Sequence, residues 1–264
     1  MDALTPYLPC PICGSSRRRG LDRYSTPDWK LAACEDCGFV YLANPPPYEA
    51  LEEDLAWEVS HKRRLERRGG STPISGLNRR FRERFGLNRG RVRGKRFVDF
   101  FGPGRVLDIG CGGGNRLEPP ITPYGIELSK VLHAKADALM RSRGGHCLHG
   151  AGAETLDAFE DGFFDGVLMF SYLEHEVQVA KTLRGVHRVL KPGGRAYVRV
   201  PNFGSLNRRV LGARWCGFRW PDHVNYFTPG TLRAVAERFG FGLKLVNRAT
   251  LPVDDNVSAL LVRK

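Results

Sequence analysis

The 264-residue sequence contains no apolar run that approaches the roughly 20 residues of a membrane-spanning helix. Its N-terminus, M-D-A-L-T-P-Y-L-P-C, lacks the basic-then-apolar order of a secretory signal peptide. These two absences predict a cytoplasmic protein with no transmembrane segment. Hydrophobic residues make up 42% of the chain, which is enough for a sizeable core in one large domain with a small one beside it.

Acidic residues are scarce between Lys62 and Arg96. That segment holds fourteen Lys or Arg residues against two acids, Glu66 and Glu83, so its charge of +12 nearly accounts for the net +13 of the chain. Such a basic block binds nucleic acid, anionic lipid headgroups or phosphorylated substrates, or it forms a solvated arginine-rich face. We expect residues 62–96 to make at most weak contacts with nucleic acid or lipid headgroups.

The dinucleotide-binding fingerprint G-x-G-x-x-G is also missing, although glycine is concentrated in the stretch R-V-L-D-I-G-C-G-G-G-N. Counted from Gly110, the third glycine position is occupied by Asn115. Counted from Gly112, it is occupied by Leu117. The fingerprint fails in both registers, which argues against a nicotinamide or flavin dinucleotide.

The motif that stands there instead is D-x-G-x-G-x-G, formed by Asp108, Gly110, Gly112 and Gly114 at the end of a short apolar run. An apolar run that stops at glycine is typical of a buried parallel strand, and glycine lets a ligand approach the backbone closely. Glu127 ends the next apolar run, where a carboxylate can accept hydrogen bonds from a ribose. Asp108 suits a cationic or amino-bearing ligand. The alternative is a glycine-rich turn without a ligand.

Four motifs follow one another in the order V-L-D-I-G-C-G-G-G, G-I-E-L-S, F-F-D-G-V-L-M-F-S-Y-L-E-H and R-V-L-K-P-G-G-R-A-Y-V-R-V-P-N. From Val106 to Lys264 the chain resembles class I S-adenosylmethionine-dependent methyltransferases, in their Methyltransferase-23-like branch with an N-terminal zinc ribbon. The resemblance implies a Rossmann-like methyltransferase fold and S-adenosylmethionine as cofactor. It places the cofactor against Asp108, Gly110, Gly112, Gly114, Glu127, Leu128, Ala153, Glu154 and Phe170.

Four of the seven cysteines form two pairs with the spacing C-x2-C-x20-C-x2-C, namely Cys10, Cys13, Cys34 and Cys37. Two such pairs predict a tetrahedral zinc site with four thiolate ligands. Because four thiolates leave no open coordination position, we interpret the zinc as structural. Disulfides are the alternative, but a cytosolic chain would keep them reduced.

The alternation of strand and helix patterns predicts a doubly wound, mostly parallel α/β sheet, and the resemblance implies seven strands in it. We predict a zinc ribbon over 1–44, a basic helical linker over 45–104 and the methyltransferase domain over 105–264. The crossover 111–123 contains three prolines, so a full helix is not expected between the first two strands.

A helix is predicted to start at the N-cap Ser129 and to run to about Arg143. Its apolar residues recur at helical spacing, which predicts one buried stripe. The expected members of that stripe are Val131, Leu132, Ala136 and Leu139.

Two histidines are candidate bases, since methyl transfer needs an aligned acceptor and can need removal of its proton. His175 follows the fourth apolar strand, where E-H can instead serve only to join a helix to the sheet. His223 lies in the loop 215–227, which we expect to fold over the carboxyl ends of the fourth and fifth strands. Its Trp215, Trp220 and Tyr226 then line an acceptor site, or else the loop is simply packed.

The predicted activity is methylation of a small-molecule acceptor such as a sugar, a lipid-linked precursor or a secondary metabolite. RNA methylation is an alternative, because a zinc ribbon and a basic linker suit a phosphate backbone. However, S-Y-L-E stands where amino-methylating enzymes carry N/D-P-P-Y/F. The third possibility is a non-catalytic zinc-ribbon adaptor.

Overall fold

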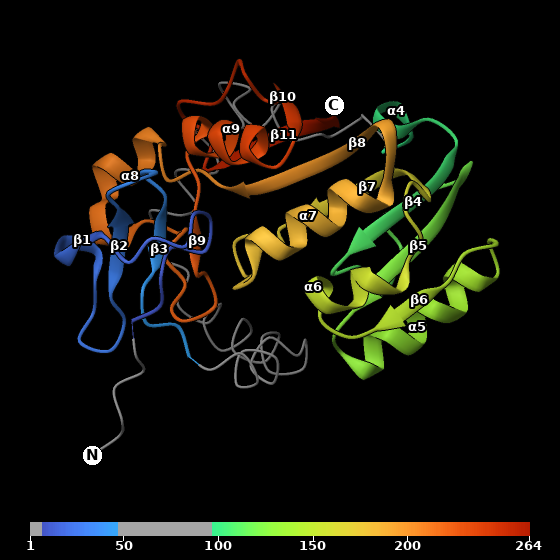
Figure 1. Cartoon of the computed structure of the whole chain (residues 1–264), viewed down its shortest axis with the longest axis horizontal. Coiled ribbons are helices and arrows are strands. Elements are labelled where there is room, and N and C mark those ends of the chain that lie inside the picture. Colours follow the sequence, from blue (N-terminus) through green and yellow to red (C-terminus); the bar gives the residue numbers. More distant parts are fainter. Residues whose placement is uncertain (1–6, 47–96) are drawn as a thin grey trace, which may run out of the picture.

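The computed structural model describes residues 7–46 and 97–264, and these contain two β-sheets (Figure 1). The larger sheet has the order β10-β11-β8-β7-β4-β5-β6, and the smaller one has the order β1-β2-β3-β9. The basic segment 62–96, with its expected helices and anionic contacts, lies outside the described residues. The strands of the larger sheet are β4 (Gly104–Ile109), β5 (Ile121–Glu127), β6 (Cys147–His149), β7 (Phe164–Phe170), β8 (Leu190–Pro201), β10 (Phe241–Leu245) and β11 (Asn256–Arg263).

Strand direction in the larger sheet is parallel from β6 through β8, and β11 is antiparallel to both of its neighbours. The prediction of a doubly wound, mostly parallel seven-stranded sheet is therefore confirmed. In such sheets ligands bind outside the carboxyl ends of the strands, where the strand order reverses. Here the order reverses between β4 and β7, so the carboxyl end of β4 is the place to examine.

Two of the longer helices begin at capping residues that the sequence marks. Ser129 accepts a hydrogen bond from the Leu132 amide at 3.3 Å, and Thr228 accepts one from the Thr231 amide at 3.0 Å. These caps satisfy amide groups that the first turn of a helix leaves unpaired. The helices are α4 (Val98–Phe101), α5 (Lys130–Arg141), α6 (Gly152–Thr155), α7 (Val179–Val189), α8 (Leu206–Leu211) and α9 (Pro229–Arg238), with 3-10 turns η1 (Asp22–Tyr24), η3 (Leu156–Ala158) and η4 (Gly212–Arg214).

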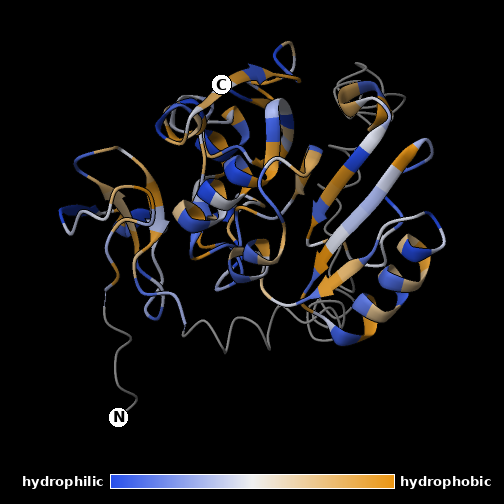
Figure 2. Ribbon diagram, turned by 45° about the vertical axis from the view of Figure 1, so that its right-hand side comes forward, coloured by the Kyte–Doolittle hydropathy of each residue, from blue (hydrophilic) through white to orange (hydrophobic). Residues whose placement is uncertain are grey.

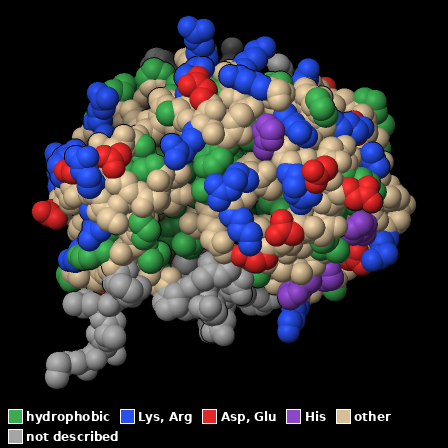
Figure 3. Space-filling view, in the orientation of Figure 1, with side chains coloured by type: hydrophobic (Ala, Val, Ile, Leu, Met, Phe, Trp, Pro, Cys, Tyr) green, Lys and Arg blue, Asp and Glu red, His purple; other side chains and the backbone are tan. Residues whose placement is uncertain are grey.

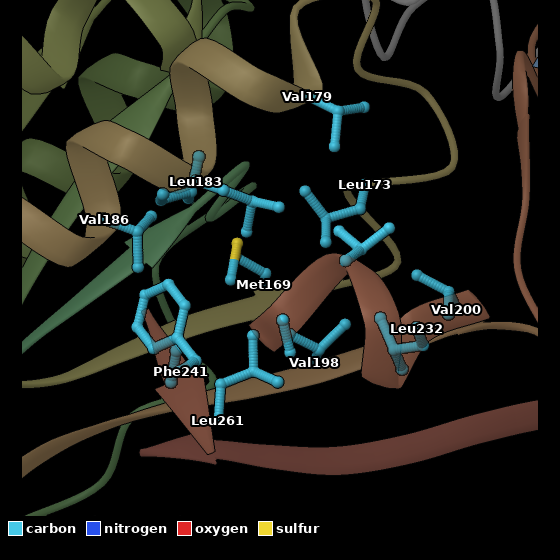
Figure 4. Packing of buried hydrophobic residues seen from close by; sticks show 14 of the residues in the cluster. Met169, Leu173, Val179, Leu183, Val186, Val198, Val200, Leu232, Phe241 and Leu261 are labelled. Carbon is cyan, nitrogen blue, oxygen red and sulfur yellow. The ribbon is translucent and has the colours of Figure 1, made fainter. Parts of the chain in front are cut away.

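The two faces of the larger sheet bury different side chains, because successive strand residues point to opposite faces. On β7, Val167 and Met169 join the cluster beneath α7 and α9, whereas Leu168 joins the cluster against Phe100 of α4. Figure 4 shows Leu183 of α7 lying next to Met169. Figure 2 shows the helices striped with hydrophobic and hydrophilic residues, as one-sided burial requires. Within the described residues, no helix has the length and apolar character to cross a membrane.

The predicted buried stripe of α5 is wrong at two positions. Val131 is 52% exposed and Leu139 is 36% exposed, whereas Ala136 and Met140 are fully buried. The helix contacts the sheet along a narrow seam in which Ala136 and Met140 pack with Cys111 and Cys147. A helix on the outer strands of a sheet buries a narrower stripe than its apolar spacing suggests, which accounts for the error.

The crossover from β4 to β5 contains no helix within residues 111–120, as its prolines predict. Leu117 is fully buried and packs with Val106 on one face of the sheet. Arg143, just beyond α5, donates hydrogen bonds to the carbonyl groups of Leu117 and Ile121. These contacts hold an irregular segment against the sheet, where a helix would otherwise supply its own hydrogen bonds.

The smaller sheet combines two distant parts of the chain. β1 (Arg18–Gly20), β2 (Leu31–Cys34) and β3 (Val40–Leu42) form an antiparallel ribbon, and β9 (Asn225–Tyr226) adds to its edge. Val40 pairs with Tyr226, and the Leu42 amide donates to the Val224 carbonyl at 2.8 Å. Figure 1 shows this sheet beside the larger one, with β9 arriving from the connection between β8 and α9. The boundaries at 44 and 104 stay a prediction.

Candidate functional site

The glycine-rich turn after β4 has the open backbone that its sequence predicts. Gly110, Gly112 and Gly114 have φ values of 69°, 58° and 77°, which side-chain-bearing residues rarely adopt. A Cβ atom added at Gly112 would have no heavy atom within 4 Å, so the space above that residue is open. A ligand can therefore reach the backbone of this turn.

Glu127 ends β5 beside this turn, and its carboxylate is fixed by two backbone amides. Oε2 accepts from the Gly112 amide at 2.7 Å, and Oε1 accepts from the Ser129 amide at 2.9 Å. Each carboxylate oxygen has a second lone pair, so both can still accept a hydrogen bond from a diol. The residues present thus fit the ribose of a nucleoside cofactor.

Asp108 lies at the end of β4 and is 1% exposed. Its Oδ2 accepts from Nη1 of Arg116 at 3.0 Å, and the same nitrogen donates to the Gly110 carbonyl at 2.9 Å. Burial raises the pKa of Asp108 to about 6, although the Arg116 guanidinium acts in the opposite direction. Oδ1 is buried and has no hydrogen-bond partner among the described residues. This oxygen fits an additional cationic donor, such as the ammonium group of a methionine moiety.

The remaining predicted cofactor residues lie in α6 and at the ends of β5 and β7. Ala153 is buried in α6, and the Leu128 carbonyl accepts from His149 Nε2 at 2.8 Å. Glu154 is directed away to α7, where its carboxylate pairs with Nζ of Lys181 at 3.3 Å. Phe170 ends β7 and has the Arg199 guanidinium 4.8 Å from its ring centroid. Assignment of these residues to the cofactor stays a prediction.

Tyr172 closes this site on one side, and it leaves room only for glycine at position 152. A Cβ atom added at Gly152 would lie 2.2 Å from the Tyr172 hydroxyl oxygen and 2.8 Å from Cγ2 of Ile109. Gly152→Ala should therefore displace Tyr172, lower the stability of the fold by roughly 1–3 kcal/mol and weaken cofactor binding. Thermal unfolding and S-adenosylhomocysteine titration measure both effects. Gly230→Ala is the control, since its Cβ would have only one contact, at 3.8 Å, and an unchanged Gly152→Ala would contradict the packing described.

The structure brings His175 and His223 together. Their ring centroids are 4.7 Å apart, and the rings are nearly perpendicular at 82°. Nδ1 of His223 donates to the Gly217 carbonyl at 2.8 Å, and burial holds the pKa of His223 well below its usual range. The neighbouring Glu174 is fully buried, and burial raises the pKa of its carboxyl to about 8.

The loop 215–227 lies over the segment that follows β7, which confirms the expected position. Asn225 Nδ2 donates to the Leu173 carbonyl at 2.8 Å, and the Val224 amide donates to the Glu174 carbonyl at 2.8 Å. An isolated bridge between Asn202 and Phe227 attaches the same loop near the end of β8. The loop thus lies at the carboxyl ends of both strands.

Two of the aromatic side chains of this loop, Trp215 and Tyr226, do not line an acceptor site as predicted. Trp215 and Tyr226 are each 1% exposed and pack in one cluster with Phe203 and with Leu31 and Val40 of the ribbon. They therefore join the ribbon to the larger sheet and present almost no surface to a ligand. The interpretation of Trp215 and Tyr226 as an acceptor lining is wrong for this reason.

The four paired cysteines lie at one end of the ribbon with their sulfur atoms within 4.8 Å of one another. The Sγ atoms of Cys10 and Cys37 are 3.5 Å apart, as are those of Cys13 and Cys34. All seven cysteines, which fall within the described residues, are free of disulfides. Gly14 and Gly38, which follow the second cysteine of each pair, have positive φ values, as a tight knuckle requires. This donor set fits one tetrahedral zinc ion.

Residues 78–245 match a family described as a methyltransferase domain, and the match covers more than half of the chain. The chain belongs to this methyltransferase family. It is 32% identical over 152 residues to the ubiquinone biosynthesis O-methyltransferases of Aromatoleum aromaticum and of Paraburkholderia phymatum. Each match covers 52% of this chain and 63% of the relative, so the chain spans less than two thirds of the length of these relatives.

Solved structures confirm the Rossmann-like methyltransferase fold. A SAM-dependent methyltransferase from Archaeoglobus fulgidus superposes with a TM-score of 0.52 at 21% identity, covering 69% of this chain and 98% of that chain. The Burkholderia thailandensis 1,6-didemethyltoxoflavin-N1-methyltransferase, solved with 1,6-didemethyltoxoflavin and S-adenosylhomocysteine, gives 0.55 at 16% identity and covers 94% and 100%. At these identities the similarity is one of fold.

Two arginines near the ends of β4 and β7 are not among the site residues predicted from the sequence. Arg116 pairs with Asp108, and Arg199 of β8 stacks on Phe170. The signal for Arg199 is a charged residue inside an otherwise apolar strand, A-Y-V-R-V. The backbone just after β7 is also unusual. Ser171 has a φ of 56°, the only positive φ of a non-glycine residue among the described residues. Strained backbone of this kind clusters at functional sites.

Proposed function

We propose that this protein transfers the methyl group of S-adenosylmethionine to an oxygen atom of a small-molecule acceptor. The observation that carries the proposal is the carboxylate of Glu127, fixed by two amides beside an open glycine turn. Membership of the methyltransferase family supports the reaction. The choice of oxygen rests on the relatives described as ubiquinone biosynthesis O-methyltransferases.

When bound, S-adenosylmethionine supplies an electrophilic methyl group on a positively charged sulfur. Glu127 would hold its ribose, and Oδ1 of Asp108 would face its ammonium group. Leu128 and Ala153 would flank the adenine ring at the end of β5. The chain thus contributes orientation of the methyl donor, which is a large part of catalysis for an in-line displacement.

The acceptor would bind beside the donor at the carboxyl ends of β7 and β8, where the loop 215–227 lies on the segment after β7. His223 is a neutral imidazole near pH 7, because burial holds its pKa well below the usual range. Its Nδ1 donates to a carbonyl, so Nε2 carries the lone pair and can accept a proton. His175 is the second candidate for this role.

His223→Gln should lower turnover by roughly 10²–10⁴-fold, the usual contribution of general base catalysis, and should leave cofactor affinity unchanged. Glutamine keeps a polar side chain in the buried site and removes the basic nitrogen. His187→Gln is the matched control, because His187 lies on α7 and packs against Phe241. Turnover and S-adenosylhomocysteine titration, measured on both variants, test the role. Equal turnover in the two variants would remove His223 from the reaction.

Cofactor affinity should fall as the pH falls through about 6. The pKa of Asp108 is raised to about 6, so the carboxylate is charged above that pH and becomes neutral below it. A neutral Asp108 no longer attracts the ammonium group of the cofactor. Titration of S-adenosylmethionine between pH 5 and 8 measures this change in affinity. Asp108→Asn should bind the cofactor weakly at every pH and show no change near pH 6. The same fall in affinity near pH 6 in Asp108→Asn would show that another group causes it.

We also propose that Cys10, Cys13, Cys34 and Cys37 hold one structural zinc ion. Four thiolates at this spacing close the coordination sphere, so the ion would take no part in methyl transfer. Figure 3 shows Lys and Arg side chains interspersed with Asp and Glu over the face drawn there.

A further inference from the structure

A second group of metal-ligating side chains lies at the acceptor side of the site, formed by Glu174, His175 and His223. One ligand atom from each residue lies within 4.8 Å of those of the other two. Glu174 and His175 follow β7 directly, whereas His223 comes from the loop 215–227. The fold therefore brings together one carboxylate and two imidazoles from segments about 50 residues apart in sequence. Carboxylate and imidazole groups are the usual ligands of divalent transition metals in proteins.

Both imidazoles are oriented by backbone carbonyl groups. Nδ1 of His175 donates to the Asp222 carbonyl at 2.7 Å, and Nδ1 of His223 donates to the Gly217 carbonyl at 2.8 Å. A carbonyl oxygen only accepts, so in the neutral form of either ring the proton lies on Nδ1 and the lone pair on Nε2. Histidines that bind metals have this arrangement, in which a hydrogen bond from one ring nitrogen fixes the tautomer and the orientation of the other.

The carboxylate of Glu174 supplies an independent observation. The residue is 2% exposed, and its Oε2 has no hydrogen-bond partner among the described residues. A buried carboxylate oxygen without a partner is unfavourable, and a bound cation removes that penalty directly. The position of Glu174 is fixed independently of its side chain, because its carbonyl accepts from the Val224 amide at 2.8 Å.

We propose that Glu174, His175 and His223 bind a divalent transition-metal cation, separate from the zinc of the four cysteines. Imidazole and carboxylate ligands suit Zn²⁺, Fe²⁺, Co²⁺ or Mn²⁺, and three protein ligands leave coordination positions open. An acceptor oxygen can take one of them. With Nε2 of His223 bound to the cation, the cation takes the place of the imidazole base and lowers the pKa of the acceptor hydroxyl. This consequence rests on the proposed methyl transfer, whereas the metal site itself does not.

The site is tested by loading the full-length, metal-stripped chain with Co²⁺ and counting the bound equivalents after gel filtration. Wild-type protein should retain two equivalents. Glu174→Gln and His223→Gln should each retain one, with the intense thiolate-to-cobalt absorption of the cysteine site unchanged. His175→Gln is a third variant in case one of the others does not fold, and His187→Gln should retain two.

One equivalent in the wild-type protein, or two in both Glu174→Gln and His223→Gln, would overturn the metal site. Cofactor binding, on which the proposed function rests, is measured separately by S-adenosylhomocysteine titration of the same samples. This binding should not depend on Glu174, His175 or His223. If the cofactor binds and the second cation does not, the imidazoles act as bases and the proposed function stands. If the second cation binds and the cofactor does not, the proposed function fails and the metal site remains.

Discussion

Replacing Cys10 and Cys34 together by serine should abolish zinc binding and reduce methyl transfer by about a hundredfold or more, in the range that loss of an aligned catalytic group produces. One cysteine is lost from each pair, so no set of four thiolates remains. Structural zinc contributes on the order of 10 kcal/mol to the folding of small domains, which makes this the largest effect we expect. The ribbon should therefore lose its fold.

The effect on methyl transfer follows from the pairing of β3 with β9. Val40 pairs with Tyr226, and Trp215 packs on the ribbon in the same cluster. The loop that carries His223 is thus one edge of the ribbon sheet. When the ribbon unfolds, His223 loses its fixed position, whereas the glycine turn and Glu127 lie in the larger sheet and keep theirs.

Zinc content, turnover and S-adenosylhomocysteine affinity of the double variant test this account together. Cys216→Ser is the control, since Cys216 is exposed and stands apart from the two pairs. Stoichiometric zinc in the double variant would contradict the metal assignment. Loss of zinc with unchanged turnover would contradict the role of the ribbon in holding the loop.

Glu127→Ala should weaken S-adenosylhomocysteine binding by roughly 10- to 150-fold. A hydrogen bond between a charged and a neutral group contributes about 1.5–3 kcal/mol, and about 1.4 kcal/mol corresponds to a tenfold change in affinity. The substitution also leaves the amides of Gly112 and Ser129 without their acceptor, so the turn itself should loosen. Both effects act in the same direction.

Calorimetric titration measures this change, with Glu160→Ala as the control. Glu160 is an exposed acid beyond η3, so its removal changes the net charge by the same amount and leaves the turn intact. Equal affinity in Glu127→Ala and in wild-type protein would remove Glu127 from the cofactor site. Equal weakening in both variants would indicate a general effect of charge.

The mostly parallel direction of the strands could be predicted because local signals mark where strands and helices begin and end. Asp108 lies one residue before the end of its strand, Glu127 ends the next one, and Ser129 and Thr228 each cap the helix that follows. The burial of α5 could not be predicted, since it depends on how closely the helix approaches β5 and β6. Apolar spacing alone does not distinguish the buried Met140 from the exposed Val131.

The contribution of β9 to the ribbon could not be predicted from the sequence. A strand of two residues, Asn225–Tyr226, has too few positions for an alternating pattern, and its partner β3 lies far away in the chain. The loop aromatics therefore looked like the lining of an acceptor site. Their packing against Leu31 and Val40 becomes apparent only when the two segments are seen side by side.

The pairing of Arg116 with Asp108 was likewise beyond sequence analysis. The sequence excludes a helix in the crossover, but the path of an irregular segment is set by tertiary contacts such as those of Leu117 and Arg143. That path returns the Arg116 guanidinium to the end of β4. A charge pair formed in this way has no fixed spacing by which a motif could reveal it.

The position of the methyl donor is central to the proposed reaction, and a crystal structure with S-adenosylhomocysteine tests it directly. The ribose should bind Glu127, and the cofactor sulfur should face Tyr172 and the loop that carries His223. Density for the cofactor away from the glycine turn, or a sulfur atom directed away from that loop, would contradict it.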